Sequence, residues 1–188
     1  SLWKPASSAV YSAYWLMKLF EEAGLPKGVI NFVPGSGGQV GTPAFTNPNL
    51  AGVHFTGSTE VFQNMWKTIS DNLKNMKYYP RIVGETGGKD FIFVHSSADV
   101  DALVVAALRG AFEYEGQKCS AASRMYIPNS LWKEFKEKYV AEVGKIKMGD
   151  VEDFTNFMGA VIDKGAFKTI TEYIKYAKES NEAEIITG

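Results

Sequence analysis

The sequence has few of the residues from which disulfides and metal sites are built. Its 188 residues include one cysteine and two histidines, His54 and His95. A single cysteine excludes an internal disulfide, and two histidines without a cysteine cluster do not supply the ligand set of a zinc site. We therefore expect no metal centre.

Charge and hydropathy set further limits. The formal net charge is -1 and no basic block occurs, whereas a nucleic-acid surface needs Lys and Arg gathered on one face. No apolar run approaches the roughly 18 residues of a membrane span. We expect no nucleic-acid or membrane partner. The 45% hydrophobic and 22% charged residues are typical of a globular protein.

Both ends of the sequence read as interior parts of a domain. Residues 1–5, SLWKP, begin without Met and lack the character of a signal or transit peptide. Residues 185–188, IITG, read as a strand that stops before its turn. We expect the chain to be an internal fragment of a longer protein.

Strand-like and helical patterns alternate along the chain. Short β-rich runs predict strands at 29–33, 53–55, 82–83, 91–94 and 125–127, and apolar periodicity predicts helices at 7–23, 58–75, 97–112, 130–147 and 164–180. Ser7 or Ser8, Ser58, and Ser97 or Asp99 are the expected N-caps. The alternation predicts an α/β fold, with a parallel sheet that carries helices on both faces.

Two glycine-containing stretches are candidates for binding phosphate. Residues 35–41, GSGGQVG, miss the spacing G-x-G-x-x-G and also suit a flexible turn before a short helix. Residues 55–58, FTGS, precede a strongly amphipathic helix, whose free N–H groups and dipole suit an anion. Glu60 opposes a phosphate there, and Ser58 can equally be an N-cap alone.

Glu85 follows a predicted strand and precedes three small residues. Ligands of α/β proteins bind at the carboxyl ends of parallel strands. A carboxylate partly removed from water is a stronger base and can activate water near neutral pH. Glu85 is therefore a candidate general base, and an exposed loop carboxylate is the alternative.

Cys119 lies among polar residues, with Gly116, Lys118 and Ser120 close by in sequence. A lone cysteine is usually a small buried hydrophobe, but a neighbouring cation favours the nucleophilic thiolate. A thiolate together with a base such as Glu85 would allow acyl-enzyme chemistry. These two residues alone would also suit a cysteine hydrolase or acyltransferase that needs no nucleotide. A purely structural or interaction segment is the non-enzymatic alternative.

Five stretches in order resemble motifs of the aldehyde dehydrogenase superfamily: KP at 4–5, EAGLP with NFVPG at 22–26 and 31–35, FTGS at 55–58, GETGGK at 84–89 and GQKC at 116–119. The resemblance implies part of a Rossmann-type NAD domain in residues 1–86. It implies part of an α/β catalytic domain in residues 87–188.

Three more stretches, YPR at 79–81, FIFVH at 91–95 and FEYEGQKCSA at 112–121, resemble the members that oxidise glutamate semialdehyde to glutamate. Another aldehyde specificity is the alternative. For the full-length protein the resemblance implies a small-molecule aldehyde substrate and a homo-oligomer. It implies the mitochondrial matrix as location in a eukaryote, and the cytoplasm otherwise.

The resemblance also implies roles for single residues. Cys119 would attack the aldehyde, and Glu85 would activate the water that hydrolyses the thioester. Ser120 would contact the substrate carboxylate, and Lys118 would add positive potential there. The residues that would bind NAD are Lys4 at the adenosine ribose, Gly57 and Ser58 at the pyrophosphate, Val61 near the adenine, and Gly35.

Two parts of the family's site have no counterpart in this sequence. The oxyanion-binding Asn would precede Lys4, and the Glu that positions the nicotinamide ribose would follow Gly188. We therefore expect the 188 residues alone to be inactive or nearly so. The resemblance favours NAD over NADP. It does not decide between them, because Ser7 stands where many NAD-preferring relatives carry a Glu that would repel a 2′-phosphate.

Overall fold

The computed structural model describes all 188 residues, which form two compact units, Ser1–Gly87 and Gly88–Gly188. The sequence predicts a boundary between residues 86 and 87. The roles assigned to the two parts are not tested by this division and stay predictions.

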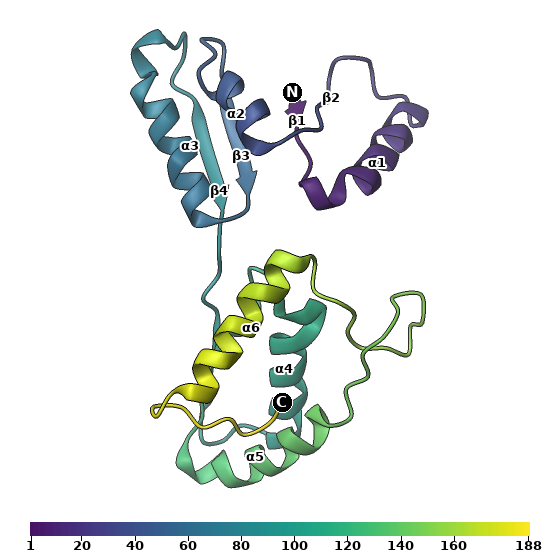
Figure 1. Ribbon diagram of the computed structural model, residues 1–188, viewed down its shortest axis with the longest axis vertical. Helices are drawn as coiled ribbons and strands as arrows, with labels where there is room; N and C mark the ends of the chain where they lie inside the picture. The colour runs from purple at the N-terminus through teal and green to yellow at the C-terminus, as the bar shows by residue number, and fades with distance from the viewer. The chain divides into compact units, whose positions relative to one another are not determined.

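The first unit has two pairs of parallel strands, and a helical crossover connects the two strands of each pair (Figure 1). Helix α1 (Val10–Glu22), preceded by η1 (Ser7–Ala9), links β1 (Leu2–Trp3) to β2 (Asn31–Phe32). Helix α3 (Thr59–Asp71), followed by η2 (Leu73–Asn75), links β3 (Gly52–Thr56) to β4 (Arg81–Glu85). Helix α2 (Gly37–Phe45) lies between the two pairs in sequence.

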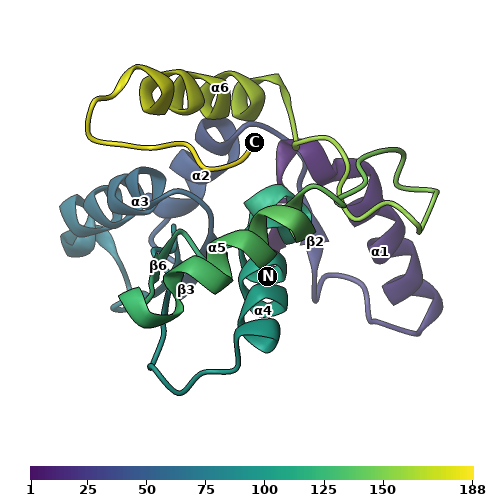
Figure 2. The ribbon, with the colours of Figure 1, turned by 90° about the horizontal axis from the view of Figure 1, so that it is seen from below.

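The second unit repeats this arrangement once. Strands β5 (Phe91–Phe93) and β6 (Arg124–Tyr126) are parallel and are linked through α4 (Val100–Phe112) and η3 (Glu113–Gly116). Two more helices follow, α5 (Asn129–Val143) and α6 (Lys164–Glu179). Helix α5 crosses α4 (Figure 2), and the buried core of the unit lies between them. Its members are Val100, Val104, Ala107 and Phe135.

The predicted helices and the parallel α/β pattern are confirmed, with local differences. Ser58 caps α3 and Asp99 caps α4 through their side chains, as expected. Ser7 and Ser8 cap nothing, because they form a 3-10 turn ahead of α1. The strands form three separate pairs instead of one sheet.

Other differences concern the ends and the glycine-rich stretch. Only Asn31–Phe32 of the run 29–33 is a strand, because its partner β1 has two residues. Residues 185–188 form no strand. The stretch after Gly35 is helix α2, capped by Ser36, and not a flexible turn. None of the helices combines the length and apolar character that a membrane crossing requires.

Candidate active site

Glu85 and Gly57 meet at the carboxyl ends of β3 and β4. The register pairs Thr56 with Glu85, and the N–H of Gly57 donates to the Glu85 carbonyl at 3.1 Å. The pairing of β3 with β4 therefore places the candidate base and the candidate anion-binding turn at the same sheet edge. The Glu85 side chain is exposed, and its role as a general base stays a prediction.

Ser58 begins α3 directly after this turn. Its hydroxyl oxygen accepts the N–H of Val61 at 3.3 Å, which satisfies one of the N–H groups that lack a partner inside the helix. The remaining N–H groups of the first turn and the helix dipole suit an anion, while the carboxylate of Glu60 in the same turn opposes one.

Aromatic rings leave no room for a side chain at Gly57 and Gly84. A Cβ atom at Gly57 would collide with the ring of Phe55, and one at Gly84 with the ring of Phe62. The two rings stack at 6.1 Å between centroids. The turn and the strand end thus lie directly over a layer of aromatic side chains.

Lys4 and Gly35 follow the two strands of the other pair in this unit. The Lys4 ammonium donates to the carbonyl of Pro5 at 2.5 Å and lies 3.5 Å from that of Gly35. Two residues assigned to cofactor binding from the sequence are therefore brought together, 31 positions apart in the chain.

Cys119 lies in the second unit and is exposed, in contrast to the usual buried cysteine. It follows a strained segment, because Tyr114 and Glu115 have φ angles of 53° and 57°. Such left-handed conformations cost about 1–2 kcal/mol for each residue other than glycine. Gly116, with a φ of 69°, adopts the same region without this cost.

Lys118, the cation next to Cys119 in the sequence, interacts with Glu113 and Tyr114. Lys118 forms an ion pair with Glu113 at 2.5 Å and lies 5.0 Å from the centroid of the Tyr114 ring. Arg109 pairs with the same carboxylate. The hydrogen bond from Lys118 and the charges of Lys118 and Arg109 hold the pKa of Glu113 below its usual value. Glu113 is thus a site residue that sequence reasoning missed.

Gly88 lies against residues 113–123, which we call the nucleophile loop because they contain the candidate nucleophile Cys119. A Cβ atom at this position would overlap with the backbone carbonyl of Cys119. The second glycine of the GETGGK stretch is therefore a contact that allows the two backbones to approach. Gly88 follows Glu85 by three positions in the sequence.

We predict that Gly88→Ala destabilises the protein by about 1–3 kcal/mol, because the added methyl group forces the Cys119 loop to move. Gly87→Ala is the matched control, since a Cβ atom there meets only Thr59 Oγ1 at 3.8 Å. Thermal unfolding of both variants measures the effect. Equal melting temperatures for the two would contradict the contact.

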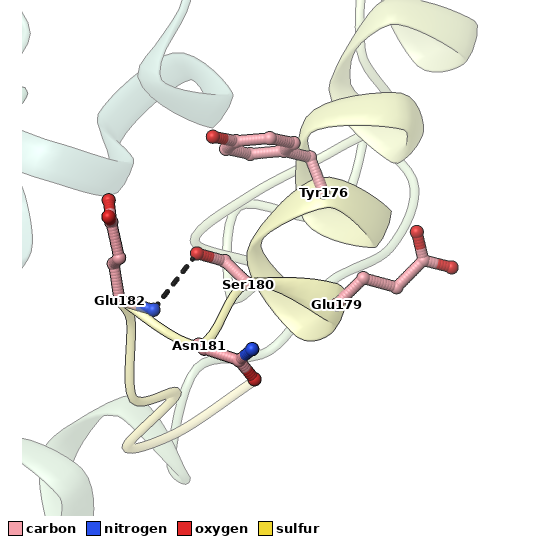
Figure 3. Close-up of a pocket in the computed structure, with 5 residues that line it drawn as sticks. All are labelled: Tyr176, Glu179, Ser180, Asn181 and Glu182. Carbon is pink, nitrogen blue, oxygen red and sulfur yellow. Dashed lines mark hydrogen bonds between the residues drawn. The ribbon is translucent and has the colours of Figure 1, made fainter.

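Two pockets of the structure are described, and Cys119 lines neither of them. One pocket is formed by Glu113, Tyr114 and Glu115 with the loop 150–160. A second is open, lies at the end of α6 around Tyr176 and Ser180, and holds no residue predicted from the sequence (Figure 3). No group of three or more His, Cys, Asp or Glu side chains is placed to hold a metal ion.

Glu85 ends one parallel strand, Gly57 and Lys4 directly follow two others, and Cys119 lies in the loop after α4. The model of the aldehyde dehydrogenase family matches residues 1–188. The chain therefore belongs to the aldehyde dehydrogenase family, and the family predicted from the five motifs is confirmed.

Several curated relatives are named delta-1-pyrroline-5-carboxylate dehydrogenase. The chain is 57% identical over 189 residues to the mitochondrial delta-1-pyrroline-5-carboxylate dehydrogenase of Dictyostelium discoideum, with all of this chain and 34% of that protein covered. The mitochondrial human enzyme of the same name is 44% identical over 188 residues, with 33% of it covered. The chain thus spans about a third of the length of the curated relatives that it matches.

Solved structures of proteins with the same name are similar to this chain in fold. The delta-pyrroline-5-carboxylate dehydrogenase of Mycobacterium tuberculosis, bound with NAD, superimposes with a TM-score of 0.92 at 46% identity, over 96% of this chain and 34% of that one. The same enzyme with NAD and cobalamin gives 0.95 at 44% identity, over 100% and 35%. The predicted α/β fold of aldehyde dehydrogenase type is confirmed.

Proposed function

We propose that the full-length protein containing this chain oxidises L-glutamate 5-semialdehyde, formed from 1-pyrroline-5-carboxylate, to L-glutamate with NAD, in proline catabolism. The observation that carries the proposal is the 57% identity over the whole chain to a delta-1-pyrroline-5-carboxylate dehydrogenase. The chain spans a third of that relative, so the activity belongs to the longer protein.

The donors in the first unit fit NAD. The N–H groups at the start of α3 suit a pyrophosphate, with Gly57 and Ser58 as the residues that approach it. Lys4, held beside Gly35 at 3.5 Å, supplies an ammonium for a ribose hydroxyl. Val61, which is 44% exposed, offers an apolar surface for the adenine. When bound, NAD accepts the hydride from the substrate.

Cys119 and Glu85 divide the chemistry between them. The Cys119 thiolate adds to the aldehyde carbon and gives a thiohemiacetal, and loss of hydride leaves a thioester on the sulfur. The Glu85 carboxylate takes a proton from water, which attacks the thioester carbonyl and releases the acid and the thiolate.

Ser120 and Lys118 are the proposed contacts of the substrate's carboxylate. Ser120 is exposed beside Cys119, and its hydroxyl can donate to an anion. The Lys118 ammonium is neutralised in part by Glu113, so Ser120 is the stronger contact of the two.

The assembly and location of the full-length protein are proposals as well. We propose a homo-oligomer located in the mitochondrial matrix in a eukaryote and in the cytoplasm otherwise. Several eukaryotic relatives are named as mitochondrial. The small number of buried hydrophobic residues, seven in 188, supports the proposal that further parts of the parent protein cover these two units.

Formation of NADH by the full-length protein tests the proposal. We expect turnover with L-glutamate 5-semialdehyde and NAD, and slower turnover with pentanal, which lacks the carboxylate and the amine. Faster oxidation of pentanal would contradict the substrate. Ester hydrolysis without any response to NAD would instead support a nucleotide-independent cysteine hydrolase.

A further inference from the structure

The nucleophile loop is tied to a distant segment by two side chains. Glu115 Oε1 accepts the backbone N–H of Gly159 at 2.6 Å, in a partly buried position. Gln117 Oε1 accepts the backbone N–H of Ile162 at 2.9 Å. The two ties span 44 and 45 positions of the sequence, so neither is a local turn contact.

The ties act on backbone that would not hold its conformation unaided. Tyr114 and Glu115 are both left-handed and neither is glycine, a state that persists only where the surroundings enforce it. Residues 159–162 belong to no helix or strand, so their N–H groups obtain partners from the side chains of the nucleophile loop. Each segment therefore stabilises the other.

Both ties lie on the N-terminal side of Cys119, four and two positions before it. On the other side the loop is held by backbone contacts, in which the N–H of Ala122 donates to Gly110 at 2.9 Å and that of Ser123 to Asp90 at 3.0 Å. With the ties broken, the N-terminal side of Cys119 would keep short-range contacts, such as the ion pair of Lys118 with Glu113, but would lose its two hydrogen bonds to residues 159–162.

We propose that Glu115 and Gln117 are positioning residues, which set the place of the Cys119 sulfur by docking the loop on residues 159–162. This rests on the proposed function, in which Cys119 is the nucleophile. Attack on a carbonyl carbon requires a near-attack geometry, and a displacement of about 1 Å can cost on the order of 100-fold in rate.

Pairs of near-isosteric variants of the full-length enzyme test the proposal. Glu115→Met and Gln117→Met remove the acceptor oxygen, whereas Glu115→Gln and Gln117→Glu retain an Oε1 atom. We expect each Met variant to lower kcat by about 10- to 100-fold, with the Kd of NAD unchanged within about twofold. Glu115→Gln restores kcat. Gln117→Glu also retains its tie, and its added carboxylate near the thiol moves the pH profile of kcat upward.

Hydrogen exchange at the two backbone amides is the second measurement, and it does not depend on turnover. We expect faster exchange at Gly159 in Glu115→Met and at Ile162 in Gln117→Met, and normal exchange in the variants that keep the oxygen. A merely structural role would lower the melting temperature and leave the kcat of the folded enzyme unchanged.

The possible failures are distinguishable. Unchanged exchange in the Met variants would show that the ties do not hold the segment, and normal kcat despite faster exchange would show that they do not position the sulfur. Either result overturns the positioning role alone. A wild-type enzyme that forms no NADH with the aldehyde would overturn the proposed function itself, and the positioning role with it.

Discussion

Replacing Cys119 with alanine is expected to lower NADH formation by the full-length protein on the order of 10⁴-fold or more, because loss of a nucleophile removes the covalent route. The fold should tolerate the change. The side chain is exposed, and the loop is held by other atoms, such as the Gln117 oxygen and the backbone of Ala122.

The measurement for this variant is a pair of titrations. Turnover is followed through NADH, and NAD binding is followed through tryptophan fluorescence. We expect the Kd of NAD to be preserved, because the proposed cofactor residues lie in the first unit. Turnover by Cys119→Ala within tenfold of the wild type would contradict the role of Cys119 as the nucleophile.

Replacing Glu85 with glutamine is expected to separate the two halves of the reaction. The thioester should form at a rate close to normal and then hydrolyse about 10²- to 10⁴-fold more slowly, because water would lack its general base. NADH should appear as a burst of about one equivalent per active site, followed by a slow steady state.

Rapid-mixing measurement of NADH reveals the burst directly. Glu22→Gln is a suitable control, since Glu22 is an exposed carboxylate at the end of α1 in the same unit, and it should show normal steady-state turnover. Loss of the burst together with the steady state would mean that Glu85 acts before hydride transfer, contrary to the proposal.

Local signals in the sequence predicted most of the elements. The amphipathic pattern with Ser58 at its start predicted α3, and the alternation of strands and helices predicted the parallel pairs. The length of a strand could not be predicted locally, because it depends on the strand with which it pairs. The strand predicted at 29–33 shortened to Asn31–Phe32 because β1 pairs with two residues only.

In the candidate site, too, residues with a local sequence signal were proposed and residues with long-range contacts were not. Glu85 and Ser58 were proposed because they stand beside glycine at the end or start of a predicted element, and Cys119 because it is the only cysteine and follows Lys118. Glu113, Glu115 and Gln117 were given no role of their own, although the last two flank Gly116. The ties of Glu115 and Gln117 reach across more than 40 positions, and two adjacent left-handed residues that are not glycine follow no local pattern.

The most direct test of the proposed mechanism is the mass of the Cys119 peptide from Glu85→Gln enzyme quenched just after the burst. We expect a glutamyl group bound through its side-chain carbonyl as a thioester to Cys119, formed only when both NAD and the semialdehyde are present. An unmodified Cys119 after a full burst, or the acyl group on another residue, would contradict it.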